Sequence, residues 1–193
     1  MVARYYNKSN EPNRRDPFRS GGFLRQGFLP RAGGEPIPLA HLPPFLRALL
    51  VTDGTVTKIL EAYYWEPIEV HTLEQGFVTV EQPMPWIQVT LGDPVLIRKA
   101  QLLGQESQRL YANAFSAIRT QYIPEQFRQQ LINREMGIGV LIRDSGLESY
   151  RELLEVGIEG EASEEQVFRT YRILIEKKPV MLITESFPLA LYR

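Results

Sequence analysis

One acidic and one basic residue stand inside apolar runs, where a charge needs a partner. Glu185 lies within VMLITESF near the end of the chain, and Arg98 lies within PVLIRKAQLL. An ionised carboxylate among hydrophobic neighbours is unfavourable unless a cation or a ligand satisfies it. If the two runs are strands of one sheet, a guanidinium and a carboxylate face each other across a pocket. The pair is therefore the first candidate for a ligand-binding site.

The same two residues also have a structural explanation. Charges on the solvent side of a half-exposed sheet, or a structural ion pair, are more common than a functional pair. Residue types alone favour that explanation, and only the order of motifs along the whole chain favours a site.

Few other residues carry chemistry. The chain has no cysteine, which excludes disulfides, zinc-thiolate sites and thiol catalysis. Its two histidines, His41 and His71, lie away from any acidic cluster with metal-ligand spacing. The GIG run at Gly137 to Gly139 lacks the rest of a dinucleotide fingerprint. We therefore expect neither a metal nor a nucleotide cofactor.

The bulk composition fits one domain preceded by a basic arm. The 193 residues are 44% hydrophobic, with no apolar run of eighteen residues and no signal-peptide pattern. Residues 1–36 hold seven Lys or Arg against three Asp or Glu, a net +4, and residues 37–193 carry a net −5. We expect a cytoplasmic protein without membrane insertion, and the oligomeric state stays open.

The arm, residues 1–36, is rich in Arg, Gly and Pro and lacks a period long enough to fold alone. We expect it to be flexible and to touch the body, residues 37–193, through Phe23, Leu24 and Phe28. Its Arg, Phe and Tyr content would also suit RNA or a membrane surface, but a flexible tail is the more common explanation. No nucleic-acid partner is expected.

The body alternates between helical and strand-like patterns. Helices are predicted over about residues 43–51, over VTKILEAYYW after Thr55, and over PEQFRQQLINRE, with GIGVLI as a short helical or turn segment. Strands are predicted at residues 68–80, 95–103, 109–118, 149–160, 166–179 and 179–188, the last two joined tightly at Lys177 and Lys178. This order predicts an α+β fold with a single antiparallel sheet of about six strands.

The order of these segments resembles chorismate pyruvate-lyase of the type found in cyanobacteria and algal plastids. The resemblance covers roughly residues 40–192 and rests on LLVTDGTVTKILE, LIRKAQLLGQESQRLYANAFSAI, NREMGIGVLI, YRELLEVGI and YRILIEKKPVMLITESFP. It implies helical flaps over a ligand pocket in the sheet. It also implies conversion of chorismate to 4-hydroxybenzoate and pyruvate without metal or organic cofactor, supplying a precursor of a quinone head group such as that of plastoquinone.

The resemblance implies catalytic roles for the two charges. Arg98 would bind the ring carboxylate, and Glu185 would meet the hydroxyl end of the ring. The chemistry agrees, because a planar guanidinium offers bidentate geometry to a carboxylate and an acidic side chain accepts a hydrogen bond from a hydroxyl. Glu185 would thereby fix the substrate so that the ring hydrogen and the enolpyruvyl oxygen leave together.

Further binding residues follow from the same resemblance. The backbone amide of Ile138 would lie near the ring carboxylate, with Gly137 as its neighbour. Val56, followed by Thr57, takes the position where bacterial enzymes place a methionine against the ligand, which leaves more room around the product.

The enolpyruvyl carboxylate needs its own cation, and the sequence offers several arginines. Surface solvation is the more common role for each of them. Arg172 is the first to test, because it lies in the strand that pairs with the strand of Glu185. The candidates are Arg143, Arg151, Arg169 and Arg172.

Two other function classes stay open at this stage. Effector domains of some bacterial transcription regulators have a similar fold, but the arm of residues 1–36 is too short and unpatterned for the winged helix that precedes them. Such a domain would bind a small acid without turnover. Alternatively, the body would be a scaffold, and the arm would bind RNA or a partner.

Overall fold

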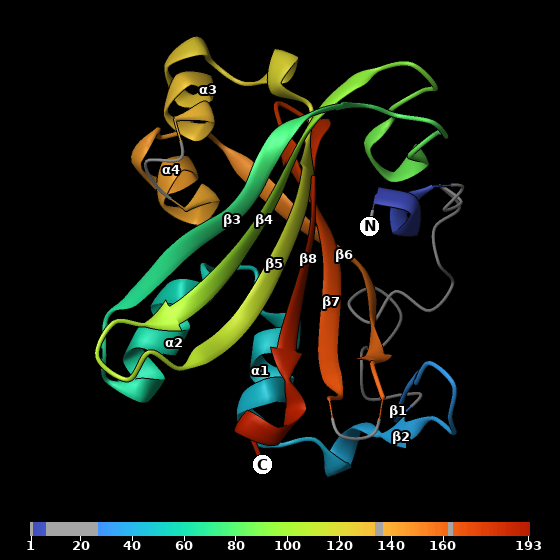
Figure 1. Ribbon diagram of the computed structural model, residues 1–193, viewed down its shortest axis with the longest axis vertical. Helices are drawn as coiled ribbons and strands as arrows, with labels where there is room; N and C mark the ends of the chain where they lie inside the picture. The colour runs from blue at the N-terminus through green and yellow to red at the C-terminus, as the bar shows by residue number, and fades with distance from the viewer. Residues whose placement is uncertain (1, 7–26, 134–136, 162–163) are drawn as a thin grey trace.

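Six strands form one antiparallel sheet in the order β3-β4-β5-β8-β7-β6 (Figure 1). The computed structural model describes residues 2–6, 27–133, 137–161 and 164–193. The strands are β3 (Ile68–Thr79), β4 (Pro94–Gly104), β5 (Leu110–Ile118), β6 (Ser149–Glu159), β7 (Gln166–Ile175) and β8 (Lys178–Pro188). The predicted α+β fold with about six antiparallel strands is confirmed.

The hairpin between β7 and β8 turns on two residues. Glu176 and Lys177 have φ values of 50° and 64°, and Lys178 already belongs to β8. Positive φ at both central positions matches the twist of the flanking strands and gives a tight hairpin. The turn therefore lies one residue earlier than the predicted connection at Lys177 and Lys178.

The helices form two pairs near opposite ends of the strands (Figure 1). The α-helices are α1 (Pro44–Val51), α2 (Val56–Tyr64), α3 (Glu125–Ile132) and α4 (Ile138–Asp144). Short 3-10 turns are η1 (Val2–Tyr5), η2 (Leu39–His41), η3 (Pro85–Ile87), η4 (Thr120–Tyr122) and η5 (Leu189–Leu191). Among the described residues, no helix has the length and apolar character needed to cross a membrane.

Three hydrophobic clusters hold the layers together. The first includes the fully buried Leu46 of α1 and Leu60 of α2, and the second includes Phe127 of α3. The third includes Tyr5 of η1 and Ile87 of η3. Burying a large apolar side chain contributes roughly 1.5–3 kcal/mol, so each cluster fixes its helices or turns firmly on the sheet.

Alternation along the strands assigns the clusters to the two faces of the sheet. In β8, Ile183 belongs to the second cluster, whereas its neighbour Leu182 belongs to the third. In β4, Leu102 belongs to the first cluster, whereas Ile97 belongs to the third. Successive strand residues point to opposite faces. Both helix pairs therefore cover one face, and η1 and η3 cover the other.

The described parts of the arm contact the body. The hydroxyl of the buried Tyr5 lies 2.8 Å from the Thr184 hydroxyl of β8. Strand β1 (Phe28–Leu29) pairs with β2 (Ile37–Pro38), and Phe28 is 61% exposed while its neighbour is buried. Phe23 and Leu24 lie outside the described residues. The division at residue 36 stays a prediction.

Candidate functional site

A pocket lies between the two helix pairs, on the face of the sheet that they cover. Its empty space, including the open mouth, is about 670 Å³. Residues of β3, β4, β5, β6, β7 and β8 line it, together with the beginnings of α2 and α4. Seven of the residues considered from the sequence line this pocket: Arg98, Glu185, Ile138, Gly137, Val56, Thr57 and Arg151.

Strand register sets the spacing of the two predicted charges. Arg98 lies opposite Ser116 of β5, and Glu185 lies opposite Ala114 of the same strand. The charges are thus two strands apart and offset by two residues. An inter-strand spacing of about 4.8 Å and a rise of about 3.4 Å per residue put their Cα atoms roughly 12 Å apart. This spacing suits two ends of one small ring better than a direct ion pair.

Arg98 is oriented by a hydroxyl on the neighbouring strand. Its Nε and Nη2 both donate to Thr72 Oγ1 of β3, at 3.2 and 2.7 Å, and the residue is only 2% exposed. Thr72 lies opposite Ala100, two residues along β4 from the arginine. The contact fixes the direction of the guanidinium at the β3–β4 side of the pocket.

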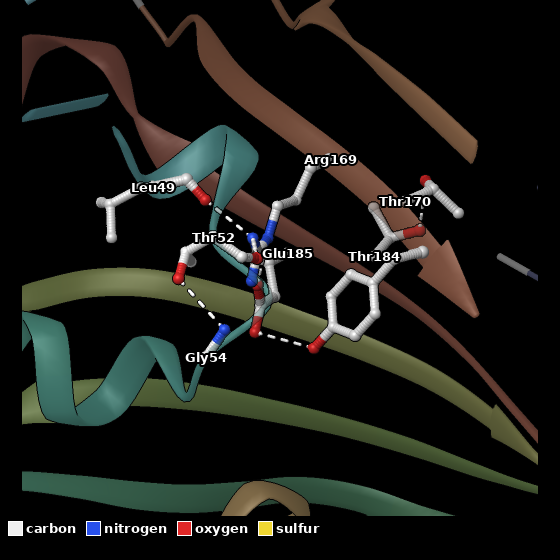
Figure 2. Close-up of polar contacts among 8 residues, drawn as sticks. Leu49, Thr52, Gly54, Arg169, Thr170, Thr184 and Glu185 are labelled. Carbon is white, nitrogen blue, oxygen red and sulfur yellow. Dashed lines mark hydrogen bonds and ion pairs between the residues drawn. The ribbon is translucent and has the colours of Figure 1, made fainter. Parts of the chain in front are cut away.

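Glu185 is held by two side chains of β7 (Figure 2). Arg169 Nε donates to Glu185 Oε2 at 2.7 Å, and the Tyr171 hydroxyl donates to Glu185 Oε1 at 3.2 Å. The Arg169 guanidinium also lies 4.9 Å from the centre of the Tyr171 ring. Both carboxylate oxygens therefore accept fixed donors, and the orientation of the carboxylate is set.

The electrostatics of this group follow from burial. Burial is the largest single influence and opposes the charge of Arg169, but Glu185 and Tyr171 together outweigh it and raise the pKa of the guanidinium. Burial, followed by the negative charge of Glu185, raises the pKa of Tyr171, so its hydroxyl stays protonated and donates. The group thus comprises a permanent cation and a permanent donor facing one carboxylate.

Arg169 also ties this group to the helical cover. Its Nη1 donates to the carbonyl oxygens of Leu49 and Thr52, at 2.8 and 2.6 Å, at the end of α1 (Figure 2). Unsatisfied carbonyls at a helix C-terminus accept such a cation readily. Thr52 Oγ1 accepts a further bond from the Gly54 amide at 3.1 Å, and Gly54 lines the pocket. One buried arginine therefore positions both Glu185 and the loop between α1 and α2.

Sequence reasoning missed this role, because Arg169 ranked there as one of several surface arginines. The residue is 1% exposed and lies directly opposite Glu185 in the β7–β8 ladder. Alternation places Arg169 and Tyr171 on one face of β7, because they are two residues apart, but it does not show that Glu185 shares this face.

The structure places Arg172 outside the pocket, contrary to the expectation from its strand. Its Nε donates to Glu152 Oε2 at 2.7 Å, and its Nη1 donates to the carbonyl of Trp86 in η3 at 2.9 Å. The pocket-lining residues of β7, Tyr171 and Ile173, flank it in sequence. Alternation therefore directs Arg172 to the opposite face of the sheet.

Two glycines let the helical cover approach closely. A Cβ atom on Gly139 would lie 2.9 Å from Thr55 Cγ2, and one on Gly137 would lie 3.2 Å from Val70 Cγ2. The first contact joins the beginning of α4 to the beginning of α2, where the two helix pairs meet over the pocket. A side chain at Gly139 would force the beginnings of α2 and α4 apart.

Within the described parts of the chain, no three His, Asp or Glu side chains gather as a metal site requires. The polar groups that line the pocket are guanidinium, hydroxyl, carboxylate and backbone groups. Such a set binds an organic acid by charge and hydrogen bonds.

Comparison with known proteins gives the pocket a context. The family described as "Chorismate pyruvate-lyase Rv2949c-like" matches residues 50–193. The chorismate pyruvate-lyase of Mycobacterium leprae is 29% identical over 153 residues, covering 74% of this chain and 73% of the relative. That of Mycobacterium tuberculosis is 24% identical over 163 residues, covering 77% and 81%. Both relatives are mycobacterial, so the cyanobacterial and plastid type expected from the sequence stays a prediction.

Solved structures share the fold. PhnF from Mycobacterium smegmatis superposes with a TM-score of 0.54 at 12% identity, over 72% of this chain and 65% of PhnF. This chain thus spans slightly less than two thirds of PhnF. The separate effector domain of PhnF gives a TM-score of 0.50 at 12% identity, over 70% of this chain and 88% of the domain. At such identities the likeness shows the fold alone.

Proposed function

Because this chain belongs to the Rv2949c-like chorismate pyruvate-lyase family, we propose that it converts chorismate to 4-hydroxybenzoate and pyruvate. The observation that carries the proposal is that Arg98 and Glu185, 87 positions apart in the sequence, line one pocket. The family supplies the reaction class, and the pocket supplies groups suited to each end of the substrate ring.

In the proposed binding mode, Arg98 holds the ring carboxylate. The contacts with Thr72 already orient its guanidinium, so little side-chain freedom is lost when the ligand binds. The amide of Ile138, beside Gly137, is a second donor to the carboxylate, and Val56 and Thr57 contact the ring from the start of α2. All four of these residues line the pocket.

Glu185 accepts a hydrogen bond from the hydroxyl at the other end of the ring. The carbon bearing this hydroxyl loses its hydrogen while the adjacent carbon loses the enolpyruvyl oxygen. The electrons of the broken C–H bond complete the aromatic ring, the electrons of the C–O bond leave with oxygen, and the enolpyruvate takes a proton to give pyruvate. Arg169 and Tyr171 hold the carboxylate in place, so orientation is its contribution to the rate.

The direct test is to incubate the purified protein with chorismate and to measure 4-hydroxybenzoate and pyruvate. Glu185→Gln replaces a charged hydrogen-bond acceptor by a neutral one, which costs about 1.5–3 kcal/mol, so it should lower kcat roughly 10–100-fold and leave 4-hydroxybenzoate binding measurable. Arg98→Ala should lower turnover and weaken binding together. Absence of product at high enzyme concentration would reject the lyase, and near-normal kinetics in both variants would reject this site.

A non-catalytic sensor of small acids is the second candidate, because the effector domain of PhnF has the same fold. Tight binding of 4-hydroxybenzoate or chorismate without turnover would favour it. Use of the product as a quinone head-group precursor, and a cytoplasmic location, stay proposals that rest on the sequence.

A further inference from the structure

Chorismate carries two carboxylates, whereas 4-hydroxybenzoate carries one. A pocket that distinguishes the substrate from the product therefore needs a second cation, placed for the carboxylate that departs with pyruvate. This inference rests on the proposed function and deepens it, because it concerns which ligands the same pocket prefers.

The structure separates the four arginines considered for this role. Arg172 lies on the opposite face, and Arg143 donates to Asp144 with 56% of its side chain exposed. Arg169 donates to Glu185 and to two backbone carbonyls at the end of α1. The remaining candidate, Arg151, lines the pocket.

Arg151 reaches the pocket from the sheet edge that lies away from Arg98. It belongs to β6 and lies opposite Ile173 of β7, which also lines the pocket. In the strand order, β5, β8 and β7 separate β6 from β4, which carries Arg98. The charge of Arg151 acts on the Tyr171 hydroxyl, the group that donates to Glu185. Across the sheet, Arg151 therefore lies on the Glu185 side of Arg98, and along the strands it lies four residues from the row of Glu185, because Ile173 is four residues from Arg169.

The environment of Arg151 suits an anionic ligand. The residue is partly buried. Its side chain has no ion pair and no hydrogen bond with any residue that the structure describes, namely residues 2–6, 27–133, 137–161 and 164–193. In contrast, the two arginines of β7, Arg169 and Arg172, both pair with glutamates. A partly desolvated guanidinium gains most from a planar carboxylate that it binds with two hydrogen bonds.

We propose that Arg151 binds the side-chain carboxylate of a ring dicarboxylate, while Arg98 binds the ring carboxylate. The enolpyruvyl group of chorismate is attached beside the hydroxyl that meets Glu185, so its carboxylate extends to the same side of the pocket as Arg151. Cleavage of the C–O bond removes that carboxylate from the ring. The aromatic product then keeps its contact with Arg98 and loses its contact with Arg151, which favours substrate over product.

The test uses a ligand that cannot be cleaved, so that it does not depend on turnover. Calorimetry compares 3-(carboxymethoxy)benzoate, a ring dicarboxylate with its second acid on a meta ether, with 4-hydroxybenzoate. Loss of a hydrogen bond to a charged group costs about 1.5–3 kcal/mol, so Arg151→Gln should weaken dicarboxylate binding roughly 10–100-fold. Binding of 4-hydroxybenzoate should change less than about twofold, which also reports that the pocket is intact.

Two matched variants complete the experiment. Arg98→Gln should weaken both ligands, and Arg143→Gln, which removes the same charge from the surface, should weaken neither. Equal effects of Arg151→Gln on both ligands, or no effect on either, would overturn the assignment. Failure of the wild type to cleave chorismate would reject the proposed reaction, whereas the dicarboxylate titration would still decide the role of Arg151.

Discussion

Strand β7 carries two arginine–glutamate pairs that look alike in chemistry and differ in place. Arg169 pairs with Glu185 and Arg172 pairs with Glu152, each with an Nε to Oε2 distance of 2.7 Å. The side chains of the first pair are 2% and 10% exposed, and those of the second are 20% and 21% exposed. The first pair borders the pocket, and the second lies on the face covered by η3.

The comparison shows that burial and strand face, rather than the ion pair itself, distinguish the two pairs. A pair that water still reaches contributes little to stability. Removing one partner of a fully buried pair leaves a charge without compensation and is strongly destabilising. The Arg169–Glu185 pair therefore supports both the fold and the proposed chemistry, whereas the Arg172–Glu152 pair supports only the packing of η3.

The largest effect is expected from Arg169→Met. This change leaves Glu185 without its cation and removes the donor to the carbonyls of Leu49 and Thr52, so it should lower the free energy of unfolding by roughly 3–5 kcal/mol. Urea denaturation measures the loss. The double variant Arg169→Met with Glu185→Gln removes the uncompensated charge and should recover part of the stability. Strictly additive losses would contradict a coupled pair.

Glu66 is a carboxylate held by neutral donors, in contrast to Glu185, which is held by the cation of Arg169. Glu66 accepts hydrogen bonds from the Tyr111 hydroxyl and from the Ser107 amide and hydroxyl, and these lower its pKa from 4.5 to about 2. A lowered pKa gives stability that is present above pH 4.5 and is lost as pH falls towards about 2. The urea midpoint of Glu66→Gln should therefore lie below that of the wild type at pH 7. The gap should close as the pH falls through that window, and a gap independent of pH would contradict this assignment.

The smallest effect is expected from Arg172→Gln. The pair with Glu152 is partly exposed, so its loss should lower the free energy of unfolding by about 1 kcal/mol or less. Turnover of chorismate should stay within about twofold of the wild type, because the side chain faces away from the pocket. A tenfold loss of kcat/KM in this variant would erase the distinction between the two pairs.

The sequence predicted the sheet and the two pocket charges because both depend on local alternation. The runs that became β4 and β8 are strongly apolar, and each contains one buried charged residue, Arg98 and Glu185, together with a more exposed lysine. The Arg98 and Glu185 side chains lie on one face because each alternates with residues that point to the third cluster on the other face, such as Ile97 and Leu182.

The partner of Glu185 was not predictable from these patterns, because it depends on a bulge. Counting back from the turn at Glu176 and Lys177 places Arg169 opposite Thr184. The ladder shifts by one residue between Ile173 and Leu174, and this shift brings Arg169 opposite Glu185. A bulge of this kind has no reliable sequence signal, so neither the buried pair nor the separate position of Arg172 followed from the sequence.

A structure of the protein with 4-hydroxybenzoate tests the central claim most directly. We expect one ligand between the two helix pairs, with its carboxylate on the Arg98 guanidinium and its hydroxyl within hydrogen-bonding distance of Glu185. A ligand bound with its carboxylate towards Glu185, or bound outside this pocket, would contradict it.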